Sequence, residues 1–104
     1  MKIKVRYYNL SAEVTKKIEE NIELKEGSTV NDAVNFLIEK YGFRFQQRAI
    51  LTMDSMKGKV TRANVYLNGQ PADYEVNYPK KMNTVLKDGD KISFGSIIGG
   101  GSFF

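Results

Sequence analysis

The chain has 104 residues, of which 41% are hydrophobic, and this length and composition suit one domain with a single modest core. It contains neither cysteine nor histidine, which excludes disulfide bonds, thiol nucleophiles and imidazole acid–base chemistry and removes the usual zinc ligands. No apolar run approaches the roughly 20 residues of a membrane span, and the first residues lack the apolar stretch of a signal peptide. We therefore expect a cytoplasmic protein that has no membrane partner.

The net charge of +4 is concentrated in one segment of the chain. Between Phe43 and Arg62, basic residues greatly outnumber the single acidic residue Asp54. The basic residues are Arg44, Arg48, Lys57, Lys59 and Arg62. Dispersed basic residues without regular aromatic interleaving are more typical of a solvated surface than of a nucleic-acid interface, so we do not expect a nucleic-acid partner. The segment could instead hold a surface for a different partner.

The first predicted element is a half-buried strand at the start of the chain, because Ile3, Val5 and Tyr7 alternate with charged residues. A second, weaker strand is predicted at residues 19–24, after a polar connection. Residues 25–27 are typical of a turn. The two strands together predict a hairpin that begins a sheet.

An amphipathic helix is predicted to begin at Val30. Thr29 is a suitable N-cap, Asp32 complements the positive end of the helix dipole, and Gly42 is a natural stop. Apolar residues recur at the spacing of one continuous helical face, so the helix should lie across the sheet. These residues are Val30, Ala33, Val34, Leu37, Ile38 and Tyr41.

The second half of the chain is predicted to supply further strands. Residues 43–62 are irregular, with a short helix near 45–50 and an exposed turn at 54–58. A strand at 63–67 ends in the turn dipeptide Asn68–Gly69, and residues 70–83 form loops with a short edge strand. A last strand at 91–97 follows a turn at 87–90.

This order of elements predicts an α+β fold, with a mixed sheet and one main helix packed on one of its faces. We expect the folded domain to span residues 1–98 and residues 99–104 to form a flexible, glycine-rich tail.

Few residues of this chain are suited to catalysis. Asp88 and Asp90 flank a glycine in a predicted turn, so we interpret them as turn formers rather than as a metal or acid–base pair. Ser93 and Ser96 have no histidine to act as a base. We therefore expect no bound cofactor or metal and no enzyme activity from this chain alone.

The C-terminus is the remaining candidate site. It consists of Gly99, Gly100 and Gly101 followed by Ser102, Phe103 and Phe104. A glycine run at a terminus has a simple interpretation as a frayed end. Only a tail without side chains, however, can thread a narrow channel and adopt whatever dihedral angles it demands.

Several segments, in this order, resemble the ubiquitin-like β-grasp sulfur carriers, above all the small subunit of molybdopterin synthase and the thiamine-pathway sulfur carrier. They are the opening strand 3–8, the turn and helix cap 26–32, Val65-Tyr66-Leu67-Asn68-Gly69, and residues 86–94 ahead of the glycine run. The resemblance spans nearly the whole chain and implies a β-grasp fold.

The resemblance also implies a function. A ubiquitin-activating-like partner would use ATP to adenylate a terminal diglycine, which is then converted to a thiocarboxylate that delivers sulfur to a synthase subunit. Molybdenum cofactor biosynthesis is the favoured destination of the sulfur, and thiamine, cysteine and transfer-RNA thiolation stay open. Gly100 and Gly101 would be the reactive residues, and Gly99, Tyr66 and Phe94 would contribute to partner docking. Phe94 could equally be a core residue.

This chain departs from the family pattern because Ser102, Phe103 and Phe104 follow the glycines. We expect a peptidase, such as a zinc peptidase, to remove this tail after Gly101. Two alternatives stay open: a protein modifier whose activated glycine is attacked by a substrate lysine, and a non-conjugated binding subunit anchored by its two terminal aromatic side chains.

Overall fold

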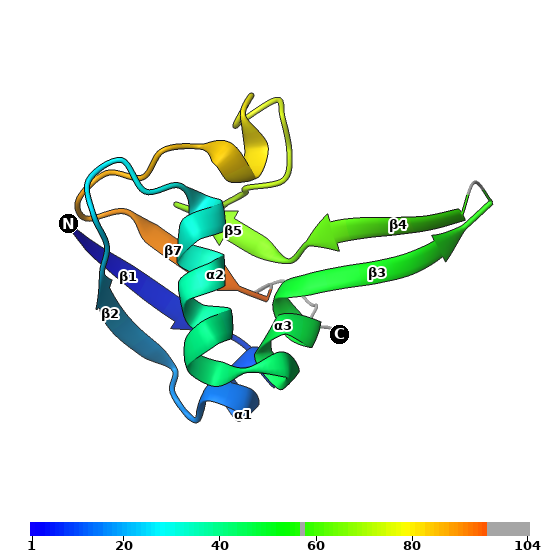
Figure 1. Cartoon of the computed structure of the whole chain (residues 1–104), viewed down its shortest axis with the longest axis horizontal. Helices are drawn as coiled ribbons and strands as arrows, with labels where there is room; N and C mark the ends of the chain where they lie inside the picture. Colours follow the sequence, from blue (N-terminus) through cyan, green and yellow to red (C-terminus); the bar gives the residue numbers. More distant parts are fainter. Residues whose placement is uncertain (57, 96–104) are drawn as a thin grey trace.

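The computed structural model describes residues 1–56 and 58–95, with only the backbone at residues 51–55 and 59–62. The elements, in chain order, are β1 (Lys2–Tyr7), α1 (Leu10–Thr15), β2 (Glu19–Glu23), α2 (Val30–Tyr41), α3 (Phe43–Ala49), β3 (Ile50–Ser55), β4 (Gly58–Ala63), β5 (Val65–Leu67), β6 (Gln70–Pro71), the 3-10 helix η1 (Lys81–Asn83) and β7 (Lys91–Phe94). Five of the strands form one sheet in the order β2-β1-β7-β5-β6, and α2 crosses one face of it (Figure 1). The predicted α+β architecture is confirmed.

The sheet is mixed because its first and last strands run in the same direction. Strand β1 pairs antiparallel with β2 and parallel with β7, with Val5 opposite Ile92 and Tyr7 opposite Phe94. Strand β5 pairs antiparallel with the other edge of β7. The carboxyl end of β7 therefore lies at the same end of the sheet as the carboxyl end of β1.

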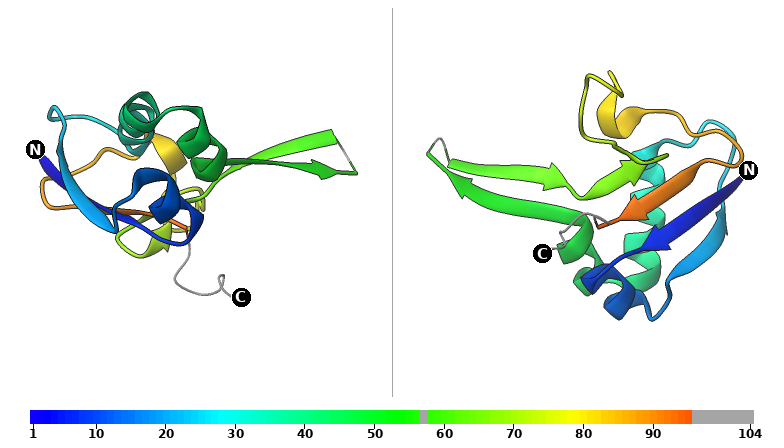
Figure 2. Two further views of the ribbon diagram at one scale, coloured as in Figure 1. Left: turned by 90° about the horizontal axis from the view of Figure 1, so that it is seen from below. Right: turned by 180° about the vertical axis from the view of Figure 1, so that it is seen from behind.

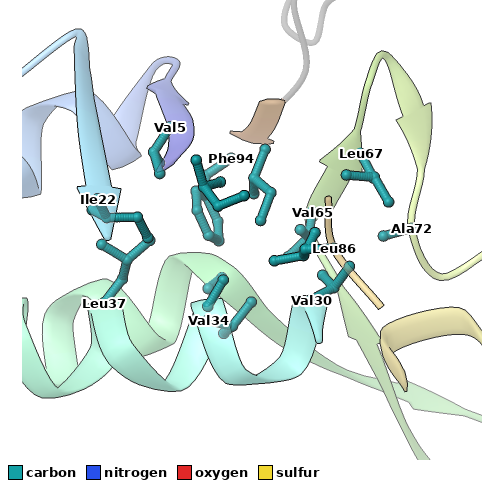
Figure 3. Packing of buried hydrophobic residues seen from close by; sticks show 14 of the residues in the cluster. Val5, Ile22, Val30, Val34, Leu37, Val65, Leu67, Ala72, Leu86 and Phe94 are labelled. Carbon is teal, nitrogen blue, oxygen red and sulfur yellow. The ribbon is translucent and has the colours of Figure 1, made fainter. Parts of the chain in front are cut away.

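The core lies between α2 and the sheet. Buried residues alternate with more exposed ones along β1 and β5, whereas three successive residues of β7 are buried. In Figure 3 the side chains of Val5, Val65 and Phe94 lie on the side of the sheet that faces the helix. The buried set includes Ile3, Val5, Ile22, Val30, Val34, Leu37, Val65, Leu67, Ile92 and Phe94. Burying such side chains contributes about 1.5–3 kcal/mol each, which is what holds α2 on the sheet.

The predicted start and stop of α2 are both confirmed. The Thr29 hydroxyl accepts a 3.2 Å hydrogen bond from the Asp32 amide, and the Asp32 carboxylate accepts a 2.9 Å hydrogen bond from the Thr29 amide. This reciprocal pair satisfies two amide groups that the first helical turn leaves without partners. At the other end, Gly42 has φ +89°, a conformation that side chains disfavour.

Two predictions for the irregular parts of the chain are wrong. The connection predicted after β1 contains the one-and-a-half-turn helix α1, which is too short to show an apolar period and is held by packing on α3. Residues 50–55 and 58–63 pair as the antiparallel β3–β4 hairpin, whereas the sequence predicted only a turn there. The short helix predicted near residues 45–50 exists as α3 and ends where β3 begins.

Candidate functional site

The site is the end of β7, from which the chain continues toward its C-terminus. The last paired residue of β7 is Phe94, whose carbonyl accepts a 3.0 Å hydrogen bond from the Tyr8 amide. Gly95 follows with φ +88°, and a Cβ at this position would lie 3.1 Å from the Tyr8 carbonyl oxygen. Both the backbone conformation and the close approach require glycine, so Gly95 fixes the direction in which the chain leaves the sheet.

Hydrogen bonds join this exit point to α3. The Gly95 amide donates to the Asn64 carbonyl at 3.5 Å, and the Asn64 amide donates to the Ala49 carbonyl at 2.7 Å. The Asn64 side-chain amide also donates to the Arg48 carbonyl at 3.2 Å. Asn64 therefore holds the end of β7 beside the junction of α3 and β3.

The reactive and processed residues predicted from the sequence lie outside the described residues. These are Gly99, Gly100, Gly101, Ser102, Phe103 and Phe104. The boundary predicted between domain and tail, at residues 98 and 99, also lies outside them. All these assignments remain predictions, and the structure supplies the point from which the tail begins.

The two aromatic residues predicted to dock a partner lie on opposite faces of the sheet. Phe94 is 0% exposed and packs on Phe45 and Tyr7, with ring centroids 4.9 Å and 6.0 Å away. Of the two interpretations of Phe94 that the sequence allowed, the core position is confirmed and the exposed docking position is wrong, because Phe94 lies on the buried face of β7. Tyr66 is half-buried on the face away from the helix, and its docking role remains a prediction.

The outer face of the sheet carries charged groups that the sequence analysis did not single out. The Arg6 guanidinium lies 3.2 Å from the Glu19 carboxylate, and Lys4 lies 3.5 Å from the same carboxylate. Arg6 also lies over the ring of Tyr8, 5.4 Å from its centroid. Lys4 and Arg6 alternate with the buried residues of β1, and this alternation is the sequence signal that could have placed them on the outer face.

The strongest electrostatic cluster centres on Glu20, which is only 9% exposed. Tyr7 donates a 2.6 Å hydrogen bond to Oε2, and Tyr41 donates to the same oxygen. Lys40 and Lys17 donate to Oε1 at 2.8 Å and 3.2 Å. Burial alone would raise the pKa of Glu20, but the hydrogen bonds from Lys40 and the two tyrosines outweigh it and lower the pKa to about 2. Burial and the Glu20 charge raise the pKa of Tyr7.

The paired aspartates act as the predicted turn formers. The Asp88 carboxylate accepts a 2.7 Å hydrogen bond from the Lys2 amide, and the Asp90 carboxylate accepts one of 2.8 Å from the Lys87 amide. Among residues 1–56 and 58–95, no three acidic, histidine or cysteine side chains gather into a set that could hold a metal ion. No helix in this described part has the length and hydropathy of a membrane span.

Comparison with known proteins decides the family. The profile of the ThiS family matches residues 5–101. The chain belongs to the ThiS family. No curated protein sequence matches it significantly.

Several solved structures have a similar fold. A protein named molybdopterin converting factor, subunit 1, from Pyrococcus furiosus is 23% identical, with a TM-score of 0.65, and the match covers 93% of this chain and 98% of that one. The HVO 2177 protein of Haloferax volcanii is 24% identical, with a TM-score of 0.67 and coverage of 96% and 86%. SAMP1 of Haloferax volcanii is 14% identical, with a TM-score of 0.64 and coverage of 95% and 98%.

These structures share the ubiquitin-like β-grasp fold with this ThiS-family chain. Membership in the family makes the chain a small ubiquitin-like sulfur carrier or modifier, of the kind that works with adenylating enzymes related to ubiquitin-activating enzymes and with synthase subunits. The profile match ends at Gly101, directly before Ser102.

Proposed function

We propose that this protein is a sulfur carrier whose reactive C-terminus is Gly100–Gly101, exposed when a peptidase removes Ser102, Phe103 and Phe104. The observation that carries the proposal is that the family match stops at Gly101, so that the last three residues are an extension beyond the family pattern. Until Ser102, Phe103 and Phe104 are removed, Gly101 has no free carboxylate, and the two aromatic side chains are too bulky for a narrow channel. The chain itself is not an enzyme in this proposal.

The proposed chemistry takes place on the carboxylate of Gly101. One carboxylate oxygen attacks the α-phosphorus of ATP in the active site of the adenylating partner, and pyrophosphate leaves. The resulting acyl adenylate has AMP as a good leaving group, so a sulfide-level nucleophile supplied by the partner can displace AMP and leave a thiocarboxylate. The glycine tail contributes only reach and freedom of dihedral angles to this step.

We propose a synthase subunit of molybdenum cofactor biosynthesis as the acceptor of the sulfur. A zinc peptidase would perform the trimming. The Pyrococcus furiosus structure described above is named as a molybdopterin converting factor, and at 23% identity its similarity shows the fold alone.

Intact-mass measurement of the protein purified from its native host tests the proposal. The expected species ends at Gly101, and a fraction of it is heavier by about 16 Da because sulfur replaces one carboxylate oxygen. Cells that make active cofactor but contain only the full-length chain would contradict it.

The second candidate is a protein modifier, which the family membership equally allows. The same adenylated Gly101 would be attacked by a lysine amine, which forms an isopeptide bond and releases AMP. Trypsin cleaves this chain last after Lys91, so lysines of other cellular proteins that carry the remnant of residues 92–101 after tryptic digestion would identify this function, and the carrier predicts none.

A further inference from the structure

The β3–β4 hairpin projects from the body of the molecule as an arm (Figures 1 and 2). Within the part of the chain that the structure describes, β3 and β4 pair only with each other, in a sheet separate from the main one. Each strand therefore has one edge with no strand beside it. An isolated two-stranded hairpin is at best marginally stable in water, so a projecting arm of this kind gains stability when another molecule covers it.

The charge of this region limits what can cover it. The segment from Phe43 to Arg62, which forms α3 and the arm, contains the whole net charge of +4, and the remainder of the chain is neutral. A second copy of the arm would bring like charge to like charge, which opposes self-association. The charge favours an acidic surface on a different molecule.

The foot of the arm, where α3 meets β3, can receive an apolar side chain of a partner. A hollow of about 370 Å³ lies there, lined by Phe43, Gln46, Gln47 and Ile50. Phe43 is 69% exposed, which is unusual for a side chain that gains so much from burial. A protein segment with one apolar side chain would fill this hollow, whereas the dispersed basic residues lack the regular aromatic interleaving typical of a nucleic-acid interface.

The foot of the arm also lies beside the start of the C-terminal tail. Asn64 accepts a hydrogen bond from Gly95 and donates one to Ala49, the last residue of α3 before β3. A partner that receives the tail is therefore adjacent to the arm and the hollow.

We propose that the enzyme that adenylates the tail also binds the arm, through an acidic segment that lies along β3 or β4 and places one apolar side chain in the hollow at Phe43. This inference rests on the proposed function, because it assigns a second contact surface to the same partner. The tail then supplies the reacting carboxylate, and the arm supplies affinity. Loss of the arm contacts should raise the KM for the carrier protein and leave kcat unchanged.

The test is ATP–pyrophosphate exchange by the ubiquitin-activating-like enzyme of the same organism, with chains that end at Gly101 as substrate. The double variant Arg44→Glu with Arg62→Glu reverses one charge on α3 and one on β4. Phe43→Ala removes an aromatic side chain that lines the hollow. Both are called the arm variants below. The matched controls are Lys25→Glu combined with Lys80→Glu, and Phe36→Ala, which make the same kinds of change at exposed residues outside the segment 43–62.

The arm variants should raise KM by about tenfold, with kcat within about twofold of the parent, and the controls should leave both within about twofold. Phe43 is an exposed side chain, so Phe43→Ala keeps the test valid should the charge-reversed arm fold poorly. Unchanged KM in both arm variants, with normal exchange by the parent chain, would overturn this inference alone. Absence of exchange with the parent chain would overturn the proposed function as well.

Two further measurements test whether a second copy of the chain or a nucleic acid binds the arm instead. Sedimentation should give a monomer, and a 20-nucleotide labelled RNA or DNA should show no change in anisotropy with the protein. A dimer that Phe43→Ala dissociates, or nucleic-acid binding that the charge reversal abolishes, would overturn the assignment of the arm to the adenylating enzyme.

Discussion

The phenolic oxygen of Tyr7 lies 2.6 Å from the Glu20 carboxylate, and this hydrogen bond joins the central strand β1 to the edge strand β2 beneath the end of α2. Lys40 and Tyr41, at the end of α2, donate to the same carboxylate. One buried charge thus connects two strands and a helix near the end of the sheet from which the tail begins. Because protonation weakens these hydrogen bonds and removes the counter-charge of Lys40, the cluster should govern the acid stability of the domain.

Replacement of Glu20 by Gln should remove most of the loss of stability in acid. The folded-state pKa of Glu20 is about 2, below its ordinary value of 4.5, so the carboxylate stabilises the fold fully above about pH 5 and loses that contribution as the pH falls toward 2. Since Lys17 and Lys40 are 46% and 40% exposed, solvent screening reduces the contribution to about 1–2 kcal/mol.

Urea unfolding at pH 7 and pH 3 measures this effect. The parent chain should lose more free energy of unfolding between the two pH values than Glu20→Gln does. Glu23→Gln, at an exposed position of the same strand, is the control and should behave like the parent. Equal pH dependence in the parent and Glu20→Gln would contradict the assignment.

Replacement of Gly95 by Ala should disturb the start of the tail more than its backbone angle alone explains. Gly95 and Gly89 have nearly the same φ, +88° and +89°, but a Cβ at Gly95 would meet Tyr8 whereas one at Gly89 meets nothing within 4 Å. Gly89→Ala therefore measures the backbone strain, about 1 kcal/mol, and Gly95→Ala adds crowding against the strand end. We expect Gly95→Ala to be the more destabilising by about 1 kcal/mol or more in urea unfolding. Equal losses of the free energy of unfolding in Gly95→Ala and Gly89→Ala would mean that Tyr8 moves away from the added methyl group without an energetic cost.

The sequence was most informative where hydrophobic residues recur with the period of one strand or one helix. The alternation of Ile3, Val5 and Tyr7 and the face of α2 were long enough to predict strand, helix and their packing. Asp32 and Thr29 marked the helix start because their reciprocal hydrogen bonds depend only on local spacing. These local signals, together with the resemblance, were sufficient for the fold.

Elements held by distant contacts could not be predicted in this way. Helix α1 is six residues long and depends on packing against α3, so no sequence period marks it. Phe94 could not be assigned to a face with certainty, because its burial depends on the register between β7 and β1. No sequence pattern distinguishes Glu20 from the other carboxylates, because only the tertiary fold brings Tyr7, Tyr41 and Lys40 to it.

Asn68 links two turns, and substitutions at it should separate hydrogen bonding from backbone strain. Its side chain donates to Asp90 at 3.1 Å and accepts from the Lys91 amide at 2.9 Å, and its φ is +49°. Asn68→Gly loses the hydrogen bonds but fits the backbone, so it should cost about 1 kcal/mol. Asn68→Ala also strains the backbone and should cost about 2 kcal/mol in urea unfolding. A smaller cost for Ala than for Gly would contradict the strain argument.

Deletion of Ser102, Phe103 and Phe104 should separate the carrier from a subunit anchored by its aromatic tail. If these residues are a removable extension, the chain ending at Gly101 bypasses the peptidase and is adenylated directly, while the full-length chain supports pyrophosphate exchange only after cleavage. If the two phenylalanines are anchors, the deletion instead abolishes binding to the partner. Exchange assays with both purified forms, in the presence and absence of the peptidase, make the comparison. Equal exchange by both forms without peptidase would contradict the processing step, because the carboxylate would then be reactive behind the two aromatic rings.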